Sequence, residues 1–419
     1  MTAFPVFILL SFCSSLFFSL IFTVNLVYQV TIVGLDPLQL VLVGTVLEAT
    51  VFIFEIPTGV VADVKSRRLS IIIGTVLTGL GFVIEGSLPF FLTVALGQML
   101  WGFGHTFTSG ATQAWIVDEI GQERAGQAFL RGAQARQAGH LIGIPISVAL
   151  ASWYIPLPII LGGALMSLLG IFLITVMPEK GFRPVPSEDR DNWGAMWETV
   201  KAARRLTGRQ PIIFTILTIG FIYGLYSEGV DRLWTAHFLD NFTLPSLGQL
   251  KPVVWFGIIR MVSLTLGLVG TEIVRQGLDT SGSRPVAITL SFCAGLMIAA
   301  LAGFALTGLF WLALVLFWIF GAFRSVTNPL YDTWLNQRID DSSVRATVFS
   351  VSGQADAIGQ VAGGPLVGVI GKFVSIRAAL FSSALLLSPA LPLYGFTIKQ
   401  NGRPGSPNGQ PIDLNPTLD

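Results

Sequence analysis

The stretch Glu55-Ile-Pro-Thr-Gly59-Val-Val-Ala-Asp63-Val-Lys65-Ser-Arg67-Arg68 lies between two long apolar runs. It has the form of a short hairpin at which one membrane span ends and the next begins. Gly59 is small enough to permit close helix approach within lipid. Asp63 lies at the end of the first of these spans, and the basic residues crowd the turn. A short loop this basic is predicted to stay in the cytoplasm.

The composition indicates an integral membrane protein. Apolar residues make up 52% of the 419 residues and charged residues only 12%, about half the charged share of a soluble domain. Long apolar runs in lipid must be helical, because every backbone polar group needs a partner within its own segment. The net charge of +1 gives no sign of a nucleic-acid partner. Cys13 and Cys293 each lie inside an apolar run, so neither a disulfide scaffold nor a zinc site is expected.

Hydropathy predicts about twelve spans of roughly 20 residues or more. Their approximate limits are residues 4–33, 38–62, 69–87, 89–118, 125–153, 158–177, 211–239, 250–274, 285–305, 309–336, 344–371 and 376–398. No basic residue precedes the first run, which is therefore interpreted as a retained span and not as a signal peptide. Basic residues gather in the loops of one side, whereas the loops of the other side hold only Lys251, Lys372 and Arg377. Both termini are predicted to be cytoplasmic.

We expect four parts along the chain. Residues 1–179 and 211–398 form two six-helix bundles, residues 180–210 form a cytoplasmic linker, and residues 399–419 form a disordered cytoplasmic tail. In the linker, apolar residues between Trp193 and Val200 recur at helical spacing, opposite basic side chains. This pattern predicts an amphipathic helix on the inner leaflet. A helix that docks a soluble partner is the alternative.

The two bundles also share a sequence repeat. Thr112-Gln-Ala-Trp115 and Tyr331-Asp-Thr-Trp334 align at their tryptophans, and an Arg-Ala pair follows each after a similar acidic turn. With the pattern Gly59-x-x-x-Asp63-x-x-x-Arg67-Arg68, the chain over about residues 4–398 resembles the major facilitator superfamily. The resemblance implies an all-α polytopic membrane fold, with twelve transmembrane helices in two pseudo-symmetric six-helix bundles, and a functional monomer. The family loop usually has a second glycine where Ser66 stands, and serine enters a left-handed turn less readily than glycine.

Further patterns resemble the drug-efflux, proton-antiporter branch of that family. They are the opening Glu55-x-Pro-Thr-Gly59 and the pattern Ala114-Trp-x-x-Asp118-Glu119. In addition, Gly359-x-x-x-Gly363-Gly364-Pro365-x-x-Gly368 resembles a pattern that antiporters carry in their fifth span. Here it lies in the eleventh span, and simple helix packing explains it equally well.

Ionisable side chains inside a membrane are costly and indicate functional sites. Most of them lie in spans that, in the family, line the cavity or the contact between the halves. Glu85, near the outer end of the third span, lies in a helix that the family places against lipid. The proton-coupling candidates are Glu228, Asp231 and Asp356. The substrate-cavity candidates are Asn25, Gln29, His105, Arg232, Trp234, Arg260 and Arg324. The signature loop supplies the predicted gate, which comprises Glu55, Gly59, Asp63, Arg67 and Arg68.

Several of these residues have two interpretations. Glu228 and Arg232 are spaced to pair along one helix face, which leaves Asp231 able to bind a proton or a cation; an outer cap that snorkels to the surface is the alternative. Asp356 is either half of an ion pair with an arginine of another span or a carboxylate that loads a proton from one side. His105 either relays protons or only hydrogen-bonds a neighbour.

Three functions are compatible with the sequence. Proton-coupled export of amphiphilic small molecules by alternating access is favoured, and uptake of a polar or anionic metabolite is the alternative within transport. A non-transporting membrane scaffold or sensor is the alternative from another class. The chain has no phosphate-binding loop, paired-histidine motif or nucleophile motif, so neither an enzyme activity, a metal nor a cofactor is expected. The predicted partners are a small-molecule substrate, protons and the lipid bilayer of the cell membrane.

Overall fold

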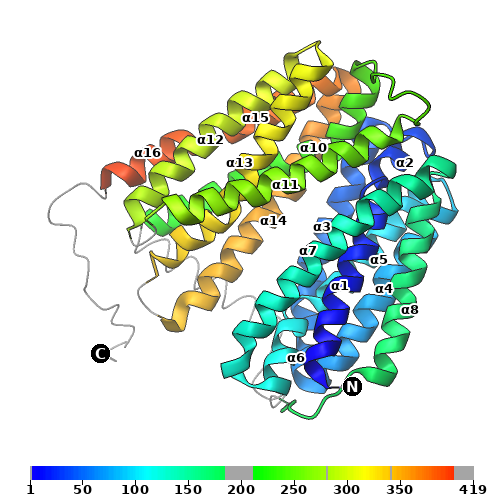
Figure 1. Cartoon of the computed structure of the whole chain (residues 1–419). Helices are drawn as coiled ribbons and strands as arrows, with labels where there is room; N and C mark the ends of the chain where they lie inside the picture. Colours follow the sequence, from blue (N-terminus) through cyan, green and yellow to red (C-terminus); the bar gives the residue numbers. More distant parts are fainter. Residues whose placement is uncertain (1, 185–210, 280–281, 340–341, 401–419) are drawn as a thin grey trace. The chain divides into compact units, whose positions relative to one another are not determined.

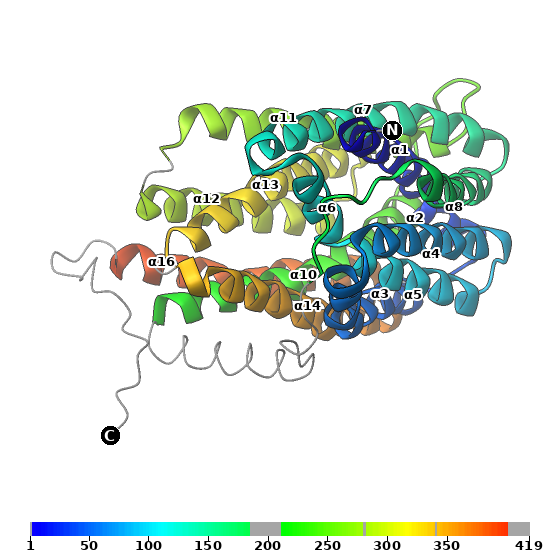
Figure 2. The same cartoon turned by 90° about the horizontal axis from the view of Figure 1, so that it is seen from below.

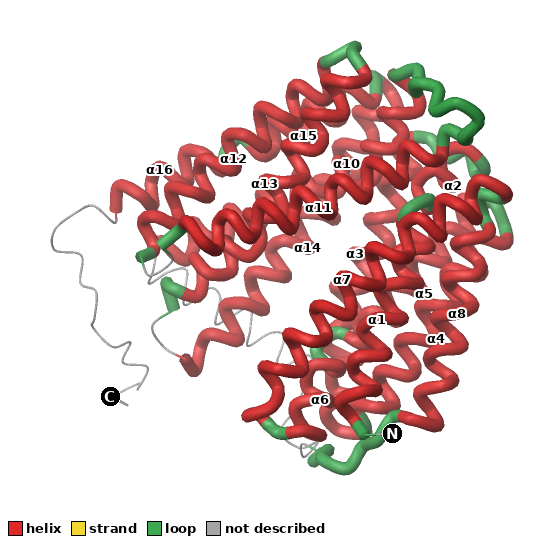
Figure 3. Tube along the Cα trace, viewed as in Figure 1, coloured by secondary structure: helices red, strands yellow, loops and turns green. Residues whose placement is uncertain are grey.

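The computed structural model describes residues 2–184, 211–279, 282–339 and 342–400, which are almost entirely helical (Figure 3). The first half contains α1 (Ala3–Phe22), α2 (Asn25–Thr31), α3 (Pro37–Val60), the π-helical turn η1 (Val61–Lys65), α4 (Arg67–Ser87), α5 (Phe91–Thr108), α6 (Ala111–Ile120), α7 (Gln122–Trp153) and α8 (Leu157–Val176). The second half contains α10 (Pro211–Asn241), α11 (Val253–Gly277), α12 (Ser283–Leu306), α13 (Phe310–Asn336), α14 (Ser342–Phe373), α15 (Ile376–Leu387) and α16 (Ala390–Gln400). The predicted linker helix lies outside the described residues, as does the predicted tail from residue 401.

Nine of the described helical segments are long and apolar enough to cross a membrane. The sequence also predicts spans over α5–α6, α7 and α14, which are helical but richer in polar and small residues. The all-helical polytopic fold predicted from the apolar runs is confirmed, and the helices are consistent with twelve spans.

Three of the predicted spans contain breaks. The first is interrupted at Thr23 and Val24, between α1 and α2. The fourth is interrupted at Gly110, whose φ of 69° is readily adopted only by glycine. The twelfth is interrupted just before α16, at Pro389. By contrast, four prolines lie inside helices without ending them: Pro57, Pro145, Pro329 and Pro365.

The described chain forms two compact units. The first contains the residues up to 184 with Glu228–Val262 and Gly364–Ala379, and the second contains 211–227, Ser263–Gly363 and the residues from Leu380. Helices α10, α11, α14 and α15 contribute to both units, so the predicted domain limits at residues 179 and 211 stay a prediction.

Close helix packing at glycines builds the first unit. Helix α1 packs along α7 and α8, and α4 packs along α5 and α8 (Figures 1 and 2). A Cβ atom at Gly79 would lie 2.5 Å from the carbonyl oxygen of Gly163, and one at Gly163 would lie 2.7 Å from that of Gly79. Only glycine at both positions allows α4 and α8 to cross this closely.

Close helix packing at glycines also builds the second unit. Helix α12 packs along α13 and α16, and α10 meets α14 at two glycines of the pattern in the eleventh span. A Cβ atom at Gly359 or Gly363 would collide with the carbonyl oxygen of Phe221 or Leu225, respectively. These two glycines therefore serve helix packing, which is the simpler interpretation of that pattern.

The repeated tryptophans occupy core positions. Trp115 and Trp334 are both among the largest fully buried side chains. Trp115 donates its Nε1–H to the carbonyl oxygen of Pro178 at 2.7 Å, and the ring of Trp334 lies 5.4 Å from that of Tyr394. Each unit thus buries the tryptophan that the repeat predicts.

Candidate functional site

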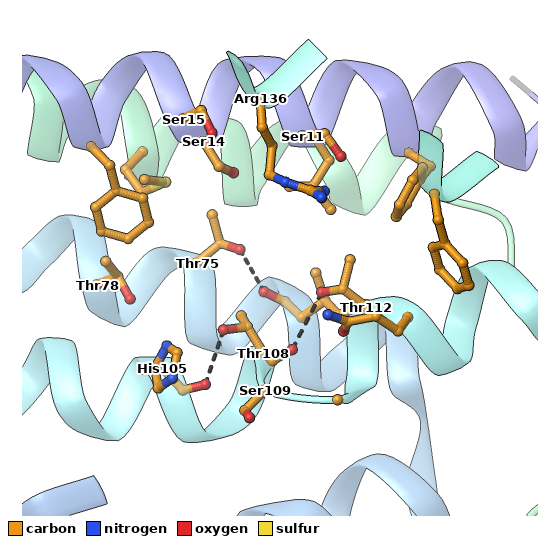
Figure 4. Close-up of a pocket in the computed structure, with 18 residues that line it drawn as sticks. Ser11, Ser14, Ser15, Thr75, Thr78, His105, Thr108, Ser109, Thr112 and Arg136 are labelled. Atoms are coloured by element: carbon orange, nitrogen blue, oxygen red, sulfur yellow. Dashed lines mark hydrogen bonds between the residues drawn. The ribbon is translucent and has the colours of Figure 1, made fainter. Parts of the chain in front are cut away.

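A cavity of about 590 Å³ lies in the first unit, among α1, α4, α5, α6 and α7 (Figure 4). Eight of its 18 lining residues carry hydroxyl groups: Ser11, Ser14, Ser15, Thr75, Thr78, Thr108, Ser109 and Thr112. The hydroxyls of Thr75 and Thr108 donate to carbonyl oxygens of their own helices, at 2.7 and 3.0 Å. Their oxygen lone pairs therefore remain available to accept hydrogen bonds from a solute.

Arg136 is the one formally charged residue in this lining. Its side chain extends from α7 into the cavity (Figure 4), and it has no ion-pair partner within the described part of the chain. His105 of α5, a predicted cavity residue, also lines this space, and Glu55 influences it electrostatically. Because no carboxylate lines the cavity, its electrostatic character is cationic.

The predicted charge pair in α10 is confirmed. Glu228 Oε1 accepts a hydrogen bond from Arg232 Nε at 2.8 Å, and the two side chains are only 4% and 12% exposed. Asp231, one residue before Arg232, is exposed and interacts electrostatically with Arg260 of α11. Gly44 of α3 provides the space for the pair, since a Cβ atom there would collide with the Glu228 carboxylate. Three predicted site residues of α10 are thus gathered with Arg260 in the first unit.

The remaining predicted site residues are not part of this group. Trp234 packs in an aromatic cluster, with ring centroids 6.2 Å from Phe238 and 5.9 Å from Phe256. In the second unit, Asp356 Oδ2 accepts a hydrogen bond from Gln360 Nε2 at 2.7 Å. Arg324 lies 5.9 Å from the ring of Tyr226.

Arg67 is the centre of the signature-loop contacts. Its Nη1 lies 2.5 Å from Asp118 Oδ2 at the end of α6, and its Nη2 lies 3.9 Å from Asp63 Oδ1. Its guanidinium also lies 5.9 Å from the ring of Phe182. The loop is therefore bound through charge to the C-terminal end of α6.

Glu179, which follows α8, also binds the signature loop. Its carboxylate accepts hydrogen bonds from Ser66 Oγ at 2.6 Å and from the backbone N–H of Arg68 at 2.8 Å. The Arg68 guanidinium donates to the carbonyl oxygen of Ile174. Together these contacts bind the start of α4 to the chain that follows α8.

Two expectations about the loop are wrong. Ser66 has φ −175°, which is extended backbone and not the left-handed turn that favours glycine, and its Oγ accepts a hydrogen bond from Leu69 N at 2.9 Å. It caps α4. A Cβ atom at Gly59 would meet nothing within 4 Å, so the expected close helix approach does not occur there among the described residues. Glu55 is exposed.

Glu85 lies on the buried face of α4, a helix that is expected at the periphery of the bundle. Glu85 is completely buried and hydrogen-bonds Gln29 and Gln98. Asn25 and Gln29, predicted as cavity residues, belong to this buried cluster and are absent from the cavity lining. Packing of α2 and α5 around α4 creates the cluster.

Comparison with known proteins gives the family. A family model for the "Major Facilitator Superfamily" matches residues 7–277, well over half of the chain. The chain belongs to the major facilitator superfamily. The uncharacterized MFS-type transporter YxaM of Bacillus subtilis (strain 168) is 25% identical over 373 residues, which cover 86% of this chain and 87% of that protein. This major facilitator is therefore a multi-pass membrane transporter.

Solved structures agree on the fold of this superfamily member. A point mutant of the nucleoside transporter NupG has a TM-score of 0.76 at 13% identity, with 96% of this chain and 100% of that chain covered. A POT family transporter in complex with a thioalcohol-conjugated peptide has a TM-score of 0.74 at 14% identity, with 95% and 96% covered. A bacterial homologue of the human lysosomal transporter Spinster has a TM-score of 0.71 at 13% identity, with 94% and 96% covered. At such low identity these likenesses show the fold alone.

Sequence reasoning did not select several residues that shape the sites of this major facilitator. Arg136 was recognised only as one of many intramembrane charges, and no local pattern sets it apart. Gly44 and Glu179 carry no motif of their own. A signal for Glu85 did exist, because an acidic residue within a predicted span is costly wherever it lies.

Proposed function

We propose that this chain is a secondary active transporter that carries a polar small molecule with an anionic group, by alternating access and in exchange with or together with protons. The observation that carries the proposal is the lone Arg136 in a cavity lined by hydroxyl groups. Guanidinium groups bind carboxylates and phosphates through two parallel hydrogen bonds. Hydroxyl groups can both donate to and accept from a polar solute.

Charge argues against a lipophilic cation in the same cavity. A cationic solute would have to lie near the Arg136 guanidinium, with no carboxylate in the lining to offset the repulsion. Like charges at close range repel each other, and their juxtaposition in a binding site disfavours the wrong partner. An anionic solute gains from the same arrangement.

Export of amphiphilic small molecules, which the sequence favours, is the second candidate, and the charge of Arg136 limits it to neutral ones. Aromatic rings support it: Phe18 lines the cavity and lies 6.3 Å from Trp101 and 6.4 Å from Phe82, ring centroid to centroid. Phe7 and Phe129 add further apolar lining. Such rings bind an apolar body while the hydroxyls bind a polar end.

Proton coupling and orientation complete the proposal. Glu228, Asp231 and Asp356 are the carboxylates put forward from the sequence to carry the proton. We place the protein in the cell membrane as a monomer with both termini in the cytoplasm. A non-transporting scaffold would have none of these activities, so measurable solute flux separates that class from transport.

The test uses purified protein in proteoliposomes. Uptake is measured under an imposed pH gradient with a panel of carboxylated and phosphorylated metabolites, lipophilic cations and neutral amphiphiles. We expect flux of an anionic solute, a loss of at least about tenfold in its apparent affinity in Arg136→Gln, and partial retention in Arg136→Lys. Tenfold corresponds to about 1.4 kcal/mol, within the range of one charge-assisted contact.

Other outcomes of this panel would redirect the proposal. Flux of neutral amphiphiles that is unaffected in Arg136→Gln would favour the export function. Flux of a lipophilic cation would contradict the anionic-solute proposal outright. Absence of flux for every compound, with folded protein, would favour the scaffold.

A further inference from the structure

A second polar cluster lies in the first unit, built around Glu85 of α4. The buried Glu85 carboxylate accepts hydrogen bonds from Gln29 Nε2 at 2.7 Å and from Gln98 Nε2 at 2.8 Å. Gln29 Nε2 also donates to Asn25 Oδ1 at 2.7 Å. Tyr28 donates its hydroxyl to the backbone carbonyl of Glu85 at 2.7 Å. One carboxyl group thus binds α2, α4 and α5 together.

No cation balances the charge of this carboxylate directly. Within the described ranges, Glu85 has no ion pair. Arg232 of α10 influences it electrostatically, but Arg232 is itself bound to Glu228 at 2.8 Å. Arg232 also interacts electrostatically with Asp231 and with Glu48 of α3. A buried carboxylate that has only amide donors is costly in its ionised form, and a bound proton removes that cost.

The remaining titratable groups beside the cluster are tyrosines. Tyr28 interacts electrostatically with both Glu85 and Tyr154. A tyrosine hydroxyl is neutral in the physiological range, so neither ring supplies the missing positive charge. Arg232 acts on Glu85 but is itself paired with Glu228, so a bound proton would neutralise the Glu85 carboxylate more directly.

The amide partners of Glu85 can serve both of its protonation states. Among the residues that the structure describes, Gln29 Oε1 and Gln98 Oε1 are buried without a donor. A half-turn of the Gln98 amide exchanges an N–H donor for a carbonyl acceptor, because the two ends of the group have nearly the same shape. Lysine or arginine at this position would only donate and would fix the ionised carboxylate.

We propose that Glu85 is a proton-binding residue of this transporter. On protonation, the carboxyl O–H donates to the carbonyl oxygen of Gln98 or Gln29 after that amide has turned. On release, the proton leaves to water and the amide returns to N–H donation. The proposal rests on the proton coupling proposed above and names a carrier that the sequence did not select.

The position of the cluster gives proton binding a structural consequence. Helix α2 follows the break at Thr23 and Val24 in the first span, and the cluster lies where α2 meets α4 and α5. Gly97 of α5 keeps this meeting close, because a Cβ atom there would lie 2.9 Å from Glu85 Cβ and 2.7 Å from the carbonyl oxygen of Gly81. A change in the hydrogen bonds of Glu85 therefore changes the contacts that bind α2 to α4 and α5.

Infrared difference spectroscopy on purified protein in lipid nanodiscs tests the proposal directly, because a protonated carboxyl group has its own carbonyl band. The wild-type protein should show such a band, and the band should fade as the pH is raised and the carboxyl group releases its proton. Glu85→Gln should lack it, and Glu85→Asp should keep it at a shifted frequency. Absence of a titrating band in the wild type, or an identical band in Glu85→Gln, would overturn the proposal.

Matched variants assign the band. Gln98→Lys supplies a fixed cation and should abolish the band at neutral pH, whereas Gln98→Met removes a donor to the carboxylate and should strengthen it. Asp231→Asn, on the exposed face of α10, should leave it unchanged. If Glu85→Gln does not fold, the shifted band of Glu85→Asp still identifies the residue.

Flux measurements separate this proposal from the proposed function. In Glu85→Gln, accumulation driven by a pH gradient should fall at least tenfold while exchange of solute without a gradient persists. If wild-type flux ignores the gradient but the Glu85 band titrates, the coupling is wrong and the proton site stands. If flux follows the gradient and Glu85→Gln leaves it unchanged, another residue carries the proton and this proposal is wrong.

Discussion

At the scale of single residues, pairs close in the sequence were predictable and contacts between distant segments were not. The spacing of Glu228 and Arg232 alone predicts their pair. Hydropathy gives the depth of Glu85 along its span but not the helix face on which it lies. Its partners Gln29 and Gln98 come from two other spans, so only the packed helices show that the carboxylate is buried.

The pair of Asp36 and Lys372 gives a pH-dependent prediction outside the membrane spans. Asp36 caps α3, accepting from Gln39 N at 2.9 Å, and its Oδ2 lies 3.0 Å from Lys372 Nζ. Burial acts to raise the pKa of Asp36, but the Gln39 backbone hydrogen bond and the Lys372 ammonium outweigh it and lower the pKa. The folded state thus favours the carboxylate, so this stabilisation is complete above the unfolded pKa of about 3.9 and is lost as the pH falls through the lower folded value.

Substitutions at Asp36 test the direction of this pH dependence. Asp36→Ala should lower the free energy of unfolding at neutral pH by about 1 kcal/mol, because it removes the helix cap. Asp36→Asn keeps a capping oxygen and should lose less. Denaturant unfolding in detergent should show that the wild-type advantage over Asp36→Asn shrinks below about pH 4. An advantage that is the same at pH 7 and at about pH 3 would contradict the assigned contact.

At the scale of elements, long apolar runs predict the spans well because lipid leaves the backbone few alternatives to a helix. The interruptions inside spans were not predicted. Thr23 and Val24 carry no local breaking signal, and Gly110 is one of 45 glycines, most of which could equally serve packing. Conversely, Pro57 and Pro145 look like helix ends and are not. Which glycine breaks a helix and which permits a crossing depends on the neighbouring helix.

Two glycine substitutions separate helix packing from helix propensity. A Cβ atom at Gly104 of α5 would lie 2.6 Å from the carbonyl oxygen of Gly74 in α4, whereas one at Gly59 of α3 would meet nothing within 4 Å. Both changes to alanine gain the same helix propensity, up to about 1 kcal/mol. Gly104→Ala should nevertheless destabilise the protein by about 1–3 kcal/mol through overpacking, and Gly59→Ala should not. Thermal unfolding in detergent measures the stability of both variants. Equal stability would contradict the close approach of α4 and α5 at Gly104.

At the scale of the whole molecule, the signature loop contacts two segments that are distant from it in the sequence. Arg67 binds Asp118 at the end of α6, while Ser66 and Arg68 bind Glu179 after α8. The basic loop is evident from the sequence, and its cytoplasmic side stays a prediction. The two acidic acceptors were not predictable, because acidic residues at helix ends are common and nothing in the sequence pairs them with the loop. Charge pairs at such a junction are suited to biasing a conformational equilibrium, since they form in one arrangement and break in another.

Because Arg67 is part of the predicted gate and pairs with Asp118, we expect Arg67→Gln to shift the equilibrium between the two alternating-access arrangements about tenfold, which corresponds to about 1.4 kcal/mol. Pulsed spin-label distances across the cytoplasmic ends would measure it, after replacement of the chain's own Cys13 and Cys293 by alanine. Arg275→Gln is the matched control: Arg275 Nη2 lies 2.6 Å from Glu272 Oε1, but the side chains are 71% and 48% exposed. Water screens that pair, so its loss should leave the distances unchanged. Equal shifts in both variants would mean that general surface charge, and not the signature loop, sets the equilibrium.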